Sequence, residues 1–218
     1  MKTASIPAVN AEYRIGKILC IGRNYAEHIR ELGNETPEAP VIFMKPASSV
    51  IHDGENITIP SYSSDCHHEA ELALLIGSAG KNIPVDRALE LVAGYGVAID
   101  LTLRDVQADL KKKGLPWDIA KGFDTACPLS AFVPADTVAD PQNLQIRMTV
   151  NGEIRQDGNT SQMIHTVRQI ISHMSQIFTL QPGDIILTGT PAGVSAIKPG
   201  DSLCAEIPGV ATLRVKVN

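Results

Sequence analysis

Two acidic residues open an apolar run that reads Glu69-Ala70-Glu71-Leu72-Ala73-Leu74-Leu75-Ile76. Side chains two positions apart on a β-strand share a face, so Glu69 and Glu71 point the same way if the run is a strand. A second apolar run, Leu91-Val92-Ala93-Gly94-Tyr95-Gly96-Val97-Ala98-Ile99, ends at Asp100. If the two strands are neighbours, the three carboxylates converge.

Three converging carboxylates favour a bound cation. Like charges at close range raise one another's pKa or require a cation between them. Hard oxygen ligands without a nearby thiolate favour Mg²⁺ or Mn²⁺. The structural alternative is that Glu69 and Glu71 end a strand in solvent and that Asp100 caps a helix. Spacing alone leaves both interpretations open.

The adjacent histidines His67 and His68 raise zinc as another candidate. Adjacent residues of a strand face opposite ways, so at most one of the two can join the glutamates. His67 is in phase with Glu69, and His68 is not. The sequence therefore favours a carboxylate site for a hard cation over a zinc site with histidine ligands.

The bulk composition is that of an ordinary globular chain. It has 218 residues, of which 44% are hydrophobic and 20% are charged, so it can bury a core. The net charge of −5 argues against a nucleic-acid surface, which usually carries a basic stripe. We find no signal pattern and no apolar stretch of membrane-spanning length, and therefore expect no membrane partner. The four cysteines form no Cys-x-x-Cys pair, which favours free thiols and a cytoplasmic location.

The order of apolar patterns predicts an α+β fold with a large β core. Residues 1–15 are expected to form an irregular lead-in, and residues 16–218 a single domain. The pattern predicts strands within 14–22, 41–44, 57–59, 72–76, 93–99, 144–150, 185–188 and 202–207, and helices at 24–32, 85–91, 101–113 and 163–178. Gly114 predicts a helix end, and Asn151-Gly152 predicts a two-residue hairpin turn.

His28 and Glu31 lie three residues apart in a predicted helix and therefore on one face. A carboxylate beside an imidazole orients the ring, which suits a general base acting on water. A surface pair is the ordinary explanation for an isolated His-x-x-Glu.

Three further groups have the chemistry to bind or stabilise an anion. Arg104 and Gln107 share a face of the helix after Asp100, and arginine can hold a carboxylate through two hydrogen bonds. Lys121 lies in an apolar context, where its ammonium could stabilise developing negative charge. The segment Thr188-Gly189-Thr190-Pro191-Ala192-Gly193 could bring backbone N–H groups to an anion, although it is no Walker loop. Each alone is also typical of a solvated helix face, a surface lysine or a plain turn.

Taken together in their order along the chain, these motifs resemble the fumarylacetoacetate hydrolase family, and in particular its short branch of acylpyruvate hydrolases, oxaloacetate decarboxylase/tautomerases and hydroxy-diene-dioate isomerases. The segments that carry the resemblance run from about residue 16 to the C-terminus. They are Gly22-Arg23-Asn24-Tyr25-Ala26-Glu27-His28, Pro40-Val41-Ile42-Phe43-Met44-Lys45-Pro46, Glu69-Ala70-Glu71-Leu72-Ala73, Gly96-Val97-Ala98-Ile99-Asp100-Leu101-Thr102, Lys121-Gly122-Phe123-Asp124 and Leu187-Thr188-Gly189-Thr190-Pro191-Ala192-Gly193.

The resemblance implies a mixed β-roll or β-sandwich with flanking helices, a catalytic domain over residues 16–218 and a homodimer. It implies Mg²⁺ or Mn²⁺ at Glu69, Glu71 and Asp100, and a catalytic dyad of His28 and Glu31, with the loop 33–40 as a lid. The other site residues implied by the resemblance are Lys121, as a catalytic group, and the substrate-binding residues Arg104, Gln107, Thr190 and Arg23.

The activity implied by the resemblance is chemistry on 2-oxo acids through a metal-bound enolate. Hydrolysis of the C–C bond of acylpyruvates, such as acetylpyruvate or fumarylpyruvate, is the leading hypothesis, with His28 and Glu31 activating water and Lys121 stabilising the oxyanion. The same site suits oxaloacetate decarboxylation or keto–enol tautomerisation. The alternatives are an isomerase of the 2-hydroxyhepta-2,4-diene-1,7-dioate type and, in a different class, a non-catalytic module that binds a metal and a keto acid.

Overall fold

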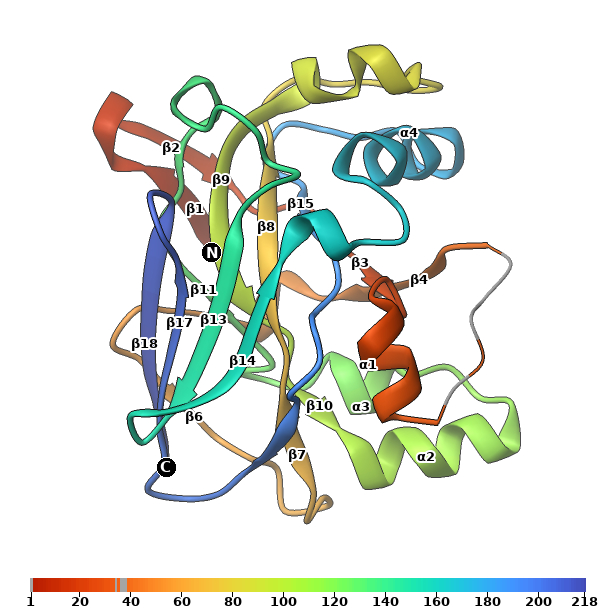
Figure 1. Ribbon diagram of the computed structural model, residues 1–218, viewed down its shortest axis with the longest axis vertical. Helices are drawn as coiled ribbons and strands as arrows, with labels where there is room; N and C mark the ends of the chain where they lie inside the picture. Colours follow the sequence, from red (N-terminus) through yellow and green to blue (C-terminus); the bar gives the residue numbers. More distant parts are fainter. Residues whose placement is uncertain (1, 34, 36–38) are drawn as a thin grey trace.

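Strands outnumber helices in the molecule, and the four α-helices lie toward one side of the strands (Figure 1). The computed structural model describes residues 2–33, 35 and 39–218. The predicted α+β class with mixed sheets is confirmed. The helices are α1 Ala26–Glu31, α2 Arg104–Lys113, α3 Asp118–Lys121 and α4 Val167–Ile177, with 3₁₀ turns at Pro7–Val9, Ala47–Ser49, Val85–Leu91, Ala135–Thr137 and Thr160–Gln162.

The described strands form four sheets. The largest has the order β4-β3-β15-β8-β9-β11-β5 with β12 attached to β9, and a five-stranded sheet has the order β14-β13-β17-β18-β6. A three-stranded sheet, β10-β7-β16, and the pair β1-β2 complete the set. The strands are β1 Thr3–Ile6, β2 Ala11–Arg14, β3 Ile18–Gly22, β4 Val41–Lys45, β5 Val50–His52, β6 Asn56–Ile57, β7 Cys66–His68, β8 Ala70–Ile76, β9 Val92–Ile99, β10 Thr102–Leu103, β11 Cys127–Leu129, β12 Val133–Pro134, β13 Gln145–Val150, β14 Glu153–Asn159, β15 Ile185–Leu187, β16 Ser195–Ile197, β17 Ser202–Ile207 and β18 Ala211–Val217.

Both faces of β8 are buried, and they contribute to different cores. Leu72 and Leu74 belong to the hydrophobic cluster that also contains residues of the five-stranded sheet. Ala73 and Leu75 belong to a second cluster formed with residues of β3, β11 and β15. Because side chains alternate along a strand, Glu71 lies on the same face as Ala73 and Leu75. The carboxylate is thereby directed into the second core and away from solvent.

The strand register brings four strand ends to one edge of the large sheet. Strands β8 and β9 are antiparallel, with Glu71 opposite Ala98, and the Asp100 amide donates to the Glu69 carbonyl at 2.8 Å. Strand β15 is antiparallel to β8 and parallel to β3. The start of β8 therefore lies beside the ends of β3, β9 and β15, and the segments after those ends meet there.

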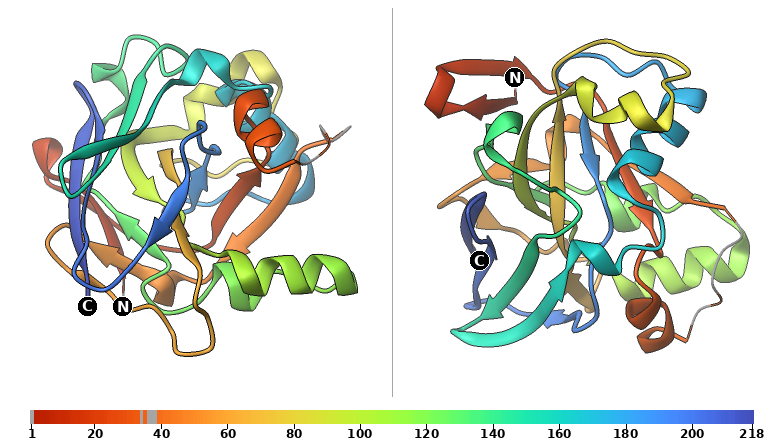
Figure 2. Two further views of the ribbon diagram at one scale, coloured as in Figure 1. Left: turned by 60° about the horizontal axis from the view of Figure 1, so that its bottom comes forward. Right: turned by 45° about the horizontal axis from the view of Figure 1, so that its top comes forward.

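The N-terminal segment is not the irregular lead-in that we expected. Strands β1 and β2 pair in antiparallel register, and Asn10 makes the connection with a left-handed φ of 50°. Ala4 and Ile6 are buried in the second core, which explains why the hairpin is ordered. The right view of Figure 2 shows this hairpin at the edge of the molecule.

Two expected helices begin later than their sequence patterns suggest. Helix α2 starts at Arg104, because Thr102 and Leu103 pair with β7, and it ends at Gly114 as predicted. Helix α4 starts after Thr166, whose side chain accepts from the Gln169 amide as an N-cap. The expected helix over residues 85–91 is a 3₁₀ helix. In the left view of Figure 2, α2 extends outward from the strands.

The loop 33–40, which we expected to form a lid, lies partly outside the described residues, because positions 34 and 36–38 are not among them. Across the described chain, none of the helices has the length and apolar character needed to cross a membrane.

Candidate active site

The three acidic residues come together as a buried cluster. One ligand oxygen of each of Glu69, Glu71 and Asp100 lies within 4.8 Å of the others. Their exposed fractions are 4%, 1% and 0%. The glutamates therefore do not end a strand in solvent, and Asp100 does not cap the next helix, whose N-cap position is Leu103.

Two cationic side chains compensate Glu69 and Asp100 from α2 and α3. Lys121 Nζ lies 2.8 Å from Glu69 Oε2 and 2.7 Å from Asp100 Oδ2. Arg104 pairs with Glu69 and donates to Gln107 Oε1 at 3.1 Å. Burial acts to raise the pKa of Glu69, but Lys121 and Arg104 outweigh it and hold that pKa well below its usual value.

Glu71 is the least compensated of the three acids. Its pKa is raised well above the usual value by burial and by the charges of Asp100 and Glu69. The backbone N–H of Gly189 donates to its Oε2 at 2.6 Å, and no ion pair to Glu71 is formed within the described chain. A hard divalent cation would relieve this repulsion, and three carboxylate oxygens are the donors that Mg²⁺ and Mn²⁺ prefer. The residues therefore fit such an ion.

The buried residue Lys45 contacts the carboxylate cluster through Asp100. Lys45 Nζ lies 2.7 Å from Asp100 Oδ1 and donates to the carbonyls of Leu101, Lys121 and Ala126. These contacts connect the segments that carry Asp100 and Lys121. Buried ammonium groups require such partners, because desolvation disfavours the charged form.

The predicted dyad is assembled on α1. His28 Nδ1 lies 3.2 Å from Glu31 Oε2, and the other Glu31 oxygen accepts from the Gly193 amide at 3.0 Å. Burial lowers the pKa of His28 below its ordinary value, although the charges of Glu69 and Glu31 oppose this effect. The ring is therefore neutral near pH 7. If Nδ1–H donates to Glu31, the Nε2 lone pair is left to accept a proton.

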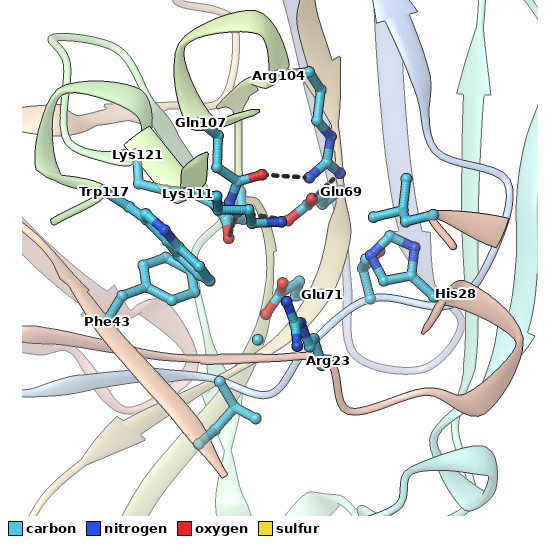
Figure 3. A pocket seen from close by; sticks show the side chains of 15 residues that line it. Arg23, His28, Phe43, Glu69, Glu71, Arg104, Gln107, Lys111, Trp117 and Lys121 are labelled. Atoms are coloured by element: carbon cyan, nitrogen blue, oxygen red, sulfur yellow. Dashed lines mark hydrogen bonds and ion pairs between the residues drawn. The ribbon is translucent and has the colours of Figure 1, made fainter. Parts of the chain in front are cut away.

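One cavity joins these elements, and Figure 3 shows its labelled side chains around Glu71. His28 lies opposite Trp117 and Phe43 in that view, with Arg104 and Gln107 from α2 above. Glu31 contacts the His28 ring but is not one of the residues that line the cavity. The other site residues that the family resemblance implies do line it, namely Arg23, His28, Glu69, Glu71, Asp100, Arg104, Gln107, Lys121 and Thr190.

Thr190 is held by a hydrogen-bond network from the five-stranded sheet. Its hydroxyl donates to the Ala70 carbonyl at 2.8 Å and accepts from Gln156 Nε2 at 2.7 Å. Gln156 is fully buried on β14, and its Oε1 accepts from the Ala70 amide. Because the hydroxyl proton is committed to Ala70, a substrate carboxylate would have to compete with that carbonyl for it.

Sequence reasoning missed several residues of the site. Phe43, Lys111 and Trp117 line the cavity, and the Phe43 and Trp117 ring centroids are 5.9 Å apart. The scarcity of aromatic residues, with a single tryptophan in the chain, was an available signal. No local pattern distinguishes Lys45 or Gln156, because their burial depends on distant segments.

The histidines next to the glutamates do not join the cluster. His67 Nε2 lies 3.0 Å from Asp65 Oδ1. The two ring nitrogens of His68 contact Gln156 and Ser195. Within the described chain, the cluster that could hold a metal ion consists of carboxylates alone.

Residues 17–218 match the profile of the family described as fumarylacetoacetate (FAA) hydrolase, C-terminal. The chain is 48% identical over 200 residues to a mitochondrial oxaloacetate tautomerase from Bos taurus, covering 92% of this chain and 90% of that one. It is 47% identical over 199 residues to an oxaloacetate tautomerase from Escherichia coli strain K12, covering 91% of each.

Solved structures show the same fold. A fumarylpyruvate hydrolase from Pseudomonas aeruginosa, in complex with Mn²⁺ and pyruvate, superposes with a TM-score of 0.95 at 37% identity, covering 99% of this chain and 95% of that one. A 2-hydroxyhepta-2,4-diene-1,7-dioate isomerase from Mycobacterium marinum superposes with a TM-score of 0.83 at 38% identity, covering 94% and 75%. The predicted fold is thereby confirmed.

Proposed function

Because the chain belongs to the fumarylacetoacetate hydrolase family, we propose that it is a divalent-metal-dependent enzyme acting on 2-oxo acids, and that it interconverts the keto and enol forms of oxaloacetate. The observation that carries the proposal is a buried three-carboxylate cluster in the same cavity as an imidazole that burial keeps neutral. The carboxylate cluster would bind a metal ion that acts as a Lewis acid, and the His28 imidazole would act as a base.

Glu69, Glu71 and Asp100 would hold the ion, with Mg²⁺ or Mn²⁺ as the candidates. When bound, such an ion supplies Lewis acidity that stabilises negative charge developing on the 2-oxo oxygen. The structural relative from Pseudomonas aeruginosa, which holds Mn²⁺ and pyruvate, supports this choice of ion and of substrate class.

The proton that tautomerisation moves is at C3 of the substrate, and His28 is the group proposed to take it. Nε2 accepts the proton while Glu31 holds Nδ1–H, so the carboxylate also stabilises the imidazolium that forms. Gly193 fixes the second oxygen of Glu31. Delivery of this proton to the 2-oxo oxygen gives the enol and restores neutral His28. In the reverse direction, His28 takes the proton of the enol hydroxyl and delivers it to C3, which gives the keto form.

Lys121 and Arg104 are proposed to provide positive charge near the reacting atoms. Lys121 lies between Glu69 and Asp100, where it can donate to an oxygen that becomes negative. Arg104 is oriented by Glu69 and Gln107, so its guanidinium is held in place for a carboxylate.

Oxaloacetate is proposed ahead of acylpyruvates because of the curated relatives. Those named oxaloacetate tautomerase are 48% and 47% identical over at least nine tenths of both chains, whereas the named fumarylpyruvate hydrolase is 37% identical. Hydrolysis of acylpyruvates remains the second candidate. The observation in its favour is the His28–Glu31 pair, which suits activation of water for attack on a distal carbonyl.

The test is a substrate panel with purified protein and Mg²⁺ or Mn²⁺. Loss of the enol absorbance of oxaloacetate should accelerate above the uncatalysed rate, and EDTA should abolish the effect. Pyruvate release from acetylpyruvate or fumarylpyruvate at a higher kcat/KM would favour the hydrolase instead. A hydroxy-diene-dioate substrate would reveal isomerase activity. Binding of Mn²⁺ and oxaloacetate without turnover of any substrate would identify a non-catalytic binding module and overturn the proposal.

We also propose that the chain acts as a homodimer. Strand β4 is an edge of the large sheet, and the large apolar side chains Met44, Leu115 and Ile119 are exposed in that part of the molecule. Light scattering with size-exclusion chromatography would test this, since a monomeric mass at micromolar concentration contradicts it. The cytoplasmic location stays a prediction, which fractionation of cells can test.

A further inference from the structure

Strand β15 ends before it reaches the start of β8, where two of the three acids lie. The pairing of these strands ends with Leu187 opposite Ala73, and Ala70 lies beyond it. In an antiparallel pair, alternate residues direct their N–H and C=O groups toward the same neighbour. The Thr188 amide donates to the Leu72 carbonyl at 3.2 Å, so the groups of Ala70 face the same side. There they need partners other than a strand, because Ala70 is fully buried.

Two side chains bind Ala70 in place of the missing strand. Gln156 Oε1 accepts from the Ala70 amide at 3.0 Å, and the Thr190 hydroxyl donates to the Ala70 carbonyl at 2.8 Å. Gln156 also holds Thr190, because its Nε2 donates to the Thr190 hydroxyl oxygen at 2.7 Å. The amide of Ala70 belongs to the peptide group shared with Glu69, and its carbonyl to the one shared with Glu71. Gln156 therefore fixes the first peptide group directly and the second through Thr190.

The carboxamide of Gln156 uses its whole hydrogen-bonding capacity. Besides the contacts with Ala70 and Thr190, Nε2 donates to the Pro191 carbonyl at 2.8 Å, and Oε1 lies 3.1 Å from His68 Nδ1. A primary amide has two N–H donors and one oxygen with two lone pairs, so both ends are saturated. Because Oε1 is an acceptor, His68 donates to it from Nδ1, and the other ring nitrogen lies 2.9 Å from Ser195 Oγ.

These contacts allow a single orientation of the Gln156 side chain. It is fully buried, and turning the amide over would bring its NH₂ group against the Ala70 amide and leave buried groups unpaired. Gln156 lies on β14 of the five-stranded sheet, whereas Glu71 lies on β8 of the large sheet and Glu69 directly before it. The hydrogen bonds of Gln156 therefore connect the acidic segment to a different sheet.

We propose that Gln156 is a positioning residue of the metal site, which sets the separation of the Glu69 and Glu71 carboxylates and thereby the affinity for a divalent cation. Side chains two positions apart on a strand share a face, and their separation follows the backbone between them. Rotation of either peptide group at Ala70 displaces one carboxylate relative to the other. Mg²⁺ requires near-ideal ligand geometry, so such a displacement weakens binding. This inference rests on the metal site of the proposed function and holds for any oxo acid substrate.

The experiment measures Mn²⁺ binding to the whole protein by calorimetry, without substrate. Gln156→Met keeps a side chain of similar length and removes the hydrogen bonds of the carboxamide. We expect Mn²⁺ affinity to fall about 10- to 100-fold, the range for losing a group that orients metal ligands. Ser195→Ala is the matched control, because it removes the partner of His68 at the far end of the same network and leaves Ala70 untouched. It should change Mn²⁺ affinity less than about 2-fold.

The outcomes separate failure of this role from failure of the proposed function. If the wild type binds Mn²⁺ and Gln156→Met binds it equally well, the positioning role alone is overturned. Equal losses in Gln156→Met and Ser195→Ala would also overturn it, because a general loss of packing would then explain both. A wild type that binds no Mn²⁺ would overturn the metal site and the proposed function with it.

A second variant keeps the proposal testable if circular dichroism shows that Gln156→Met does not fold. Thr190→Val removes the hydroxyl that donates to the Ala70 carbonyl and keeps nearly the same side-chain volume. It should lower Mn²⁺ affinity about 10-fold, because it frees the peptide group shared with Glu71. Mn²⁺ affinity within about 2-fold of the wild type in this variant would show that the peptide groups at Ala70 do not set the site, which overturns the proposal.

Discussion

The floor of the cavity, formed by Glu69, Glu71 and Asp100, and the side of the cavity formed by α1 are built in different ways. The floor carboxylates extend from paired strands, are almost fully buried, and are connected by Lys45 and Lys121. The α1 side consists of a six-residue helix, in which the Glu31 side chain is 32% exposed. A helix this short is not stable by itself, so its position depends on tertiary contacts.

This difference in construction is expected to separate metal binding, by the carboxylates, from proton transfer, by His28. The proposed metal site requires oxygens at fixed separations, and the pairing of β8 with β9 holds the three carboxylates close together. The proposed base requires only one neutral nitrogen, and a short helix fixed by Glu31 to Gly193 provides it. The floor should therefore determine metal affinity, and the α1 side should determine rate. The predictions below test this division.

The largest effect is expected from the floor. Glu71→Gln removes one proposed ligand without leaving a buried cation unpaired, because the described chain forms no ion pair to Glu71. We expect Mn²⁺ affinity to fall by more than about 100-fold, since loss of an outer-shell partner alone costs 10–100-fold, and activity to fall with it. Calorimetric titration with Mn²⁺ measures this, with Glu90→Gln on the surface as the control. Tight Mn²⁺ binding in Glu71→Gln would contradict the assigned seat.

His28→Ala changes the α1 side of the cavity and leaves the three carboxylates in place. Turnover should fall about 10²–10⁴-fold, the range for a lost general base, while Mn²⁺ affinity stays within about 2-fold of wild type. The measurements are steady-state kinetics and calorimetry on the same preparation. His52→Ala, outside the cavity, is the control. A parallel loss of Mn²⁺ binding would show that the two sides are not separable.

Lys45→Met tests the stability of the floor. Removing Lys45 leaves Asp100 with Lys121 as its cationic partner in the described chain, so we expect the free energy of unfolding to fall by about 3 kcal/mol, the low end of the range for breaking a buried ion pair. The control Lys113→Met breaks an exposed pair with Asp109 and should cost less than about 1 kcal/mol. Denaturant unfolding monitored by circular dichroism measures both. Equal stabilities of the two variants would show that the buried ammonium is dispensable.

The smallest effect is a shift of the pH profile. Burial lowers the pKa of His28, and Glu31 acts to raise it. Because the proposed base is the neutral imidazole, activity should rise with pH through a value below 6.5 and then level off. Glu31→Gln removes the opposing carboxylate, so this acid limb should move to lower pH while the plateau falls about 10-fold or less. The pH dependence of kcat/KM measures it, and a shift to higher pH would contradict the assigned roles.

The sequence predicted the local features of the site correctly. Alternation along a strand placed Glu69 and Glu71 on one side, and three-residue spacing placed His28 beside Glu31. Gly114 ends α2 as expected, and Asn151 and Gly152 form the predicted hairpin turn with positive φ values. Each of these features depends on residues within a few positions of one another.

Other features depended on segments far apart in the chain. The antiparallel register of β8 and β9 brings Asp100 beside Glu69, and β15 places Gly189 against Glu71. Lys45 reaches the site from the edge strand β4 by contacts with segments that follow later in the chain, and Gln156 reaches it from β14 of a different sheet. The N-terminal hairpin is ordered by burial of Ala4 and Ile6 against a core formed by later residues.

The amino-acid pattern by itself therefore determined which residues share a face, and the tertiary structure decided which faces meet. The physical reason is the distance along the chain over which each effect acts. Backbone geometry fixes the direction of side chains over two to four residues, so it can be read from spacing. Contacts between distant strands are fixed by the burial of apolar surface across the whole chain, and that is decided only when the chain folds.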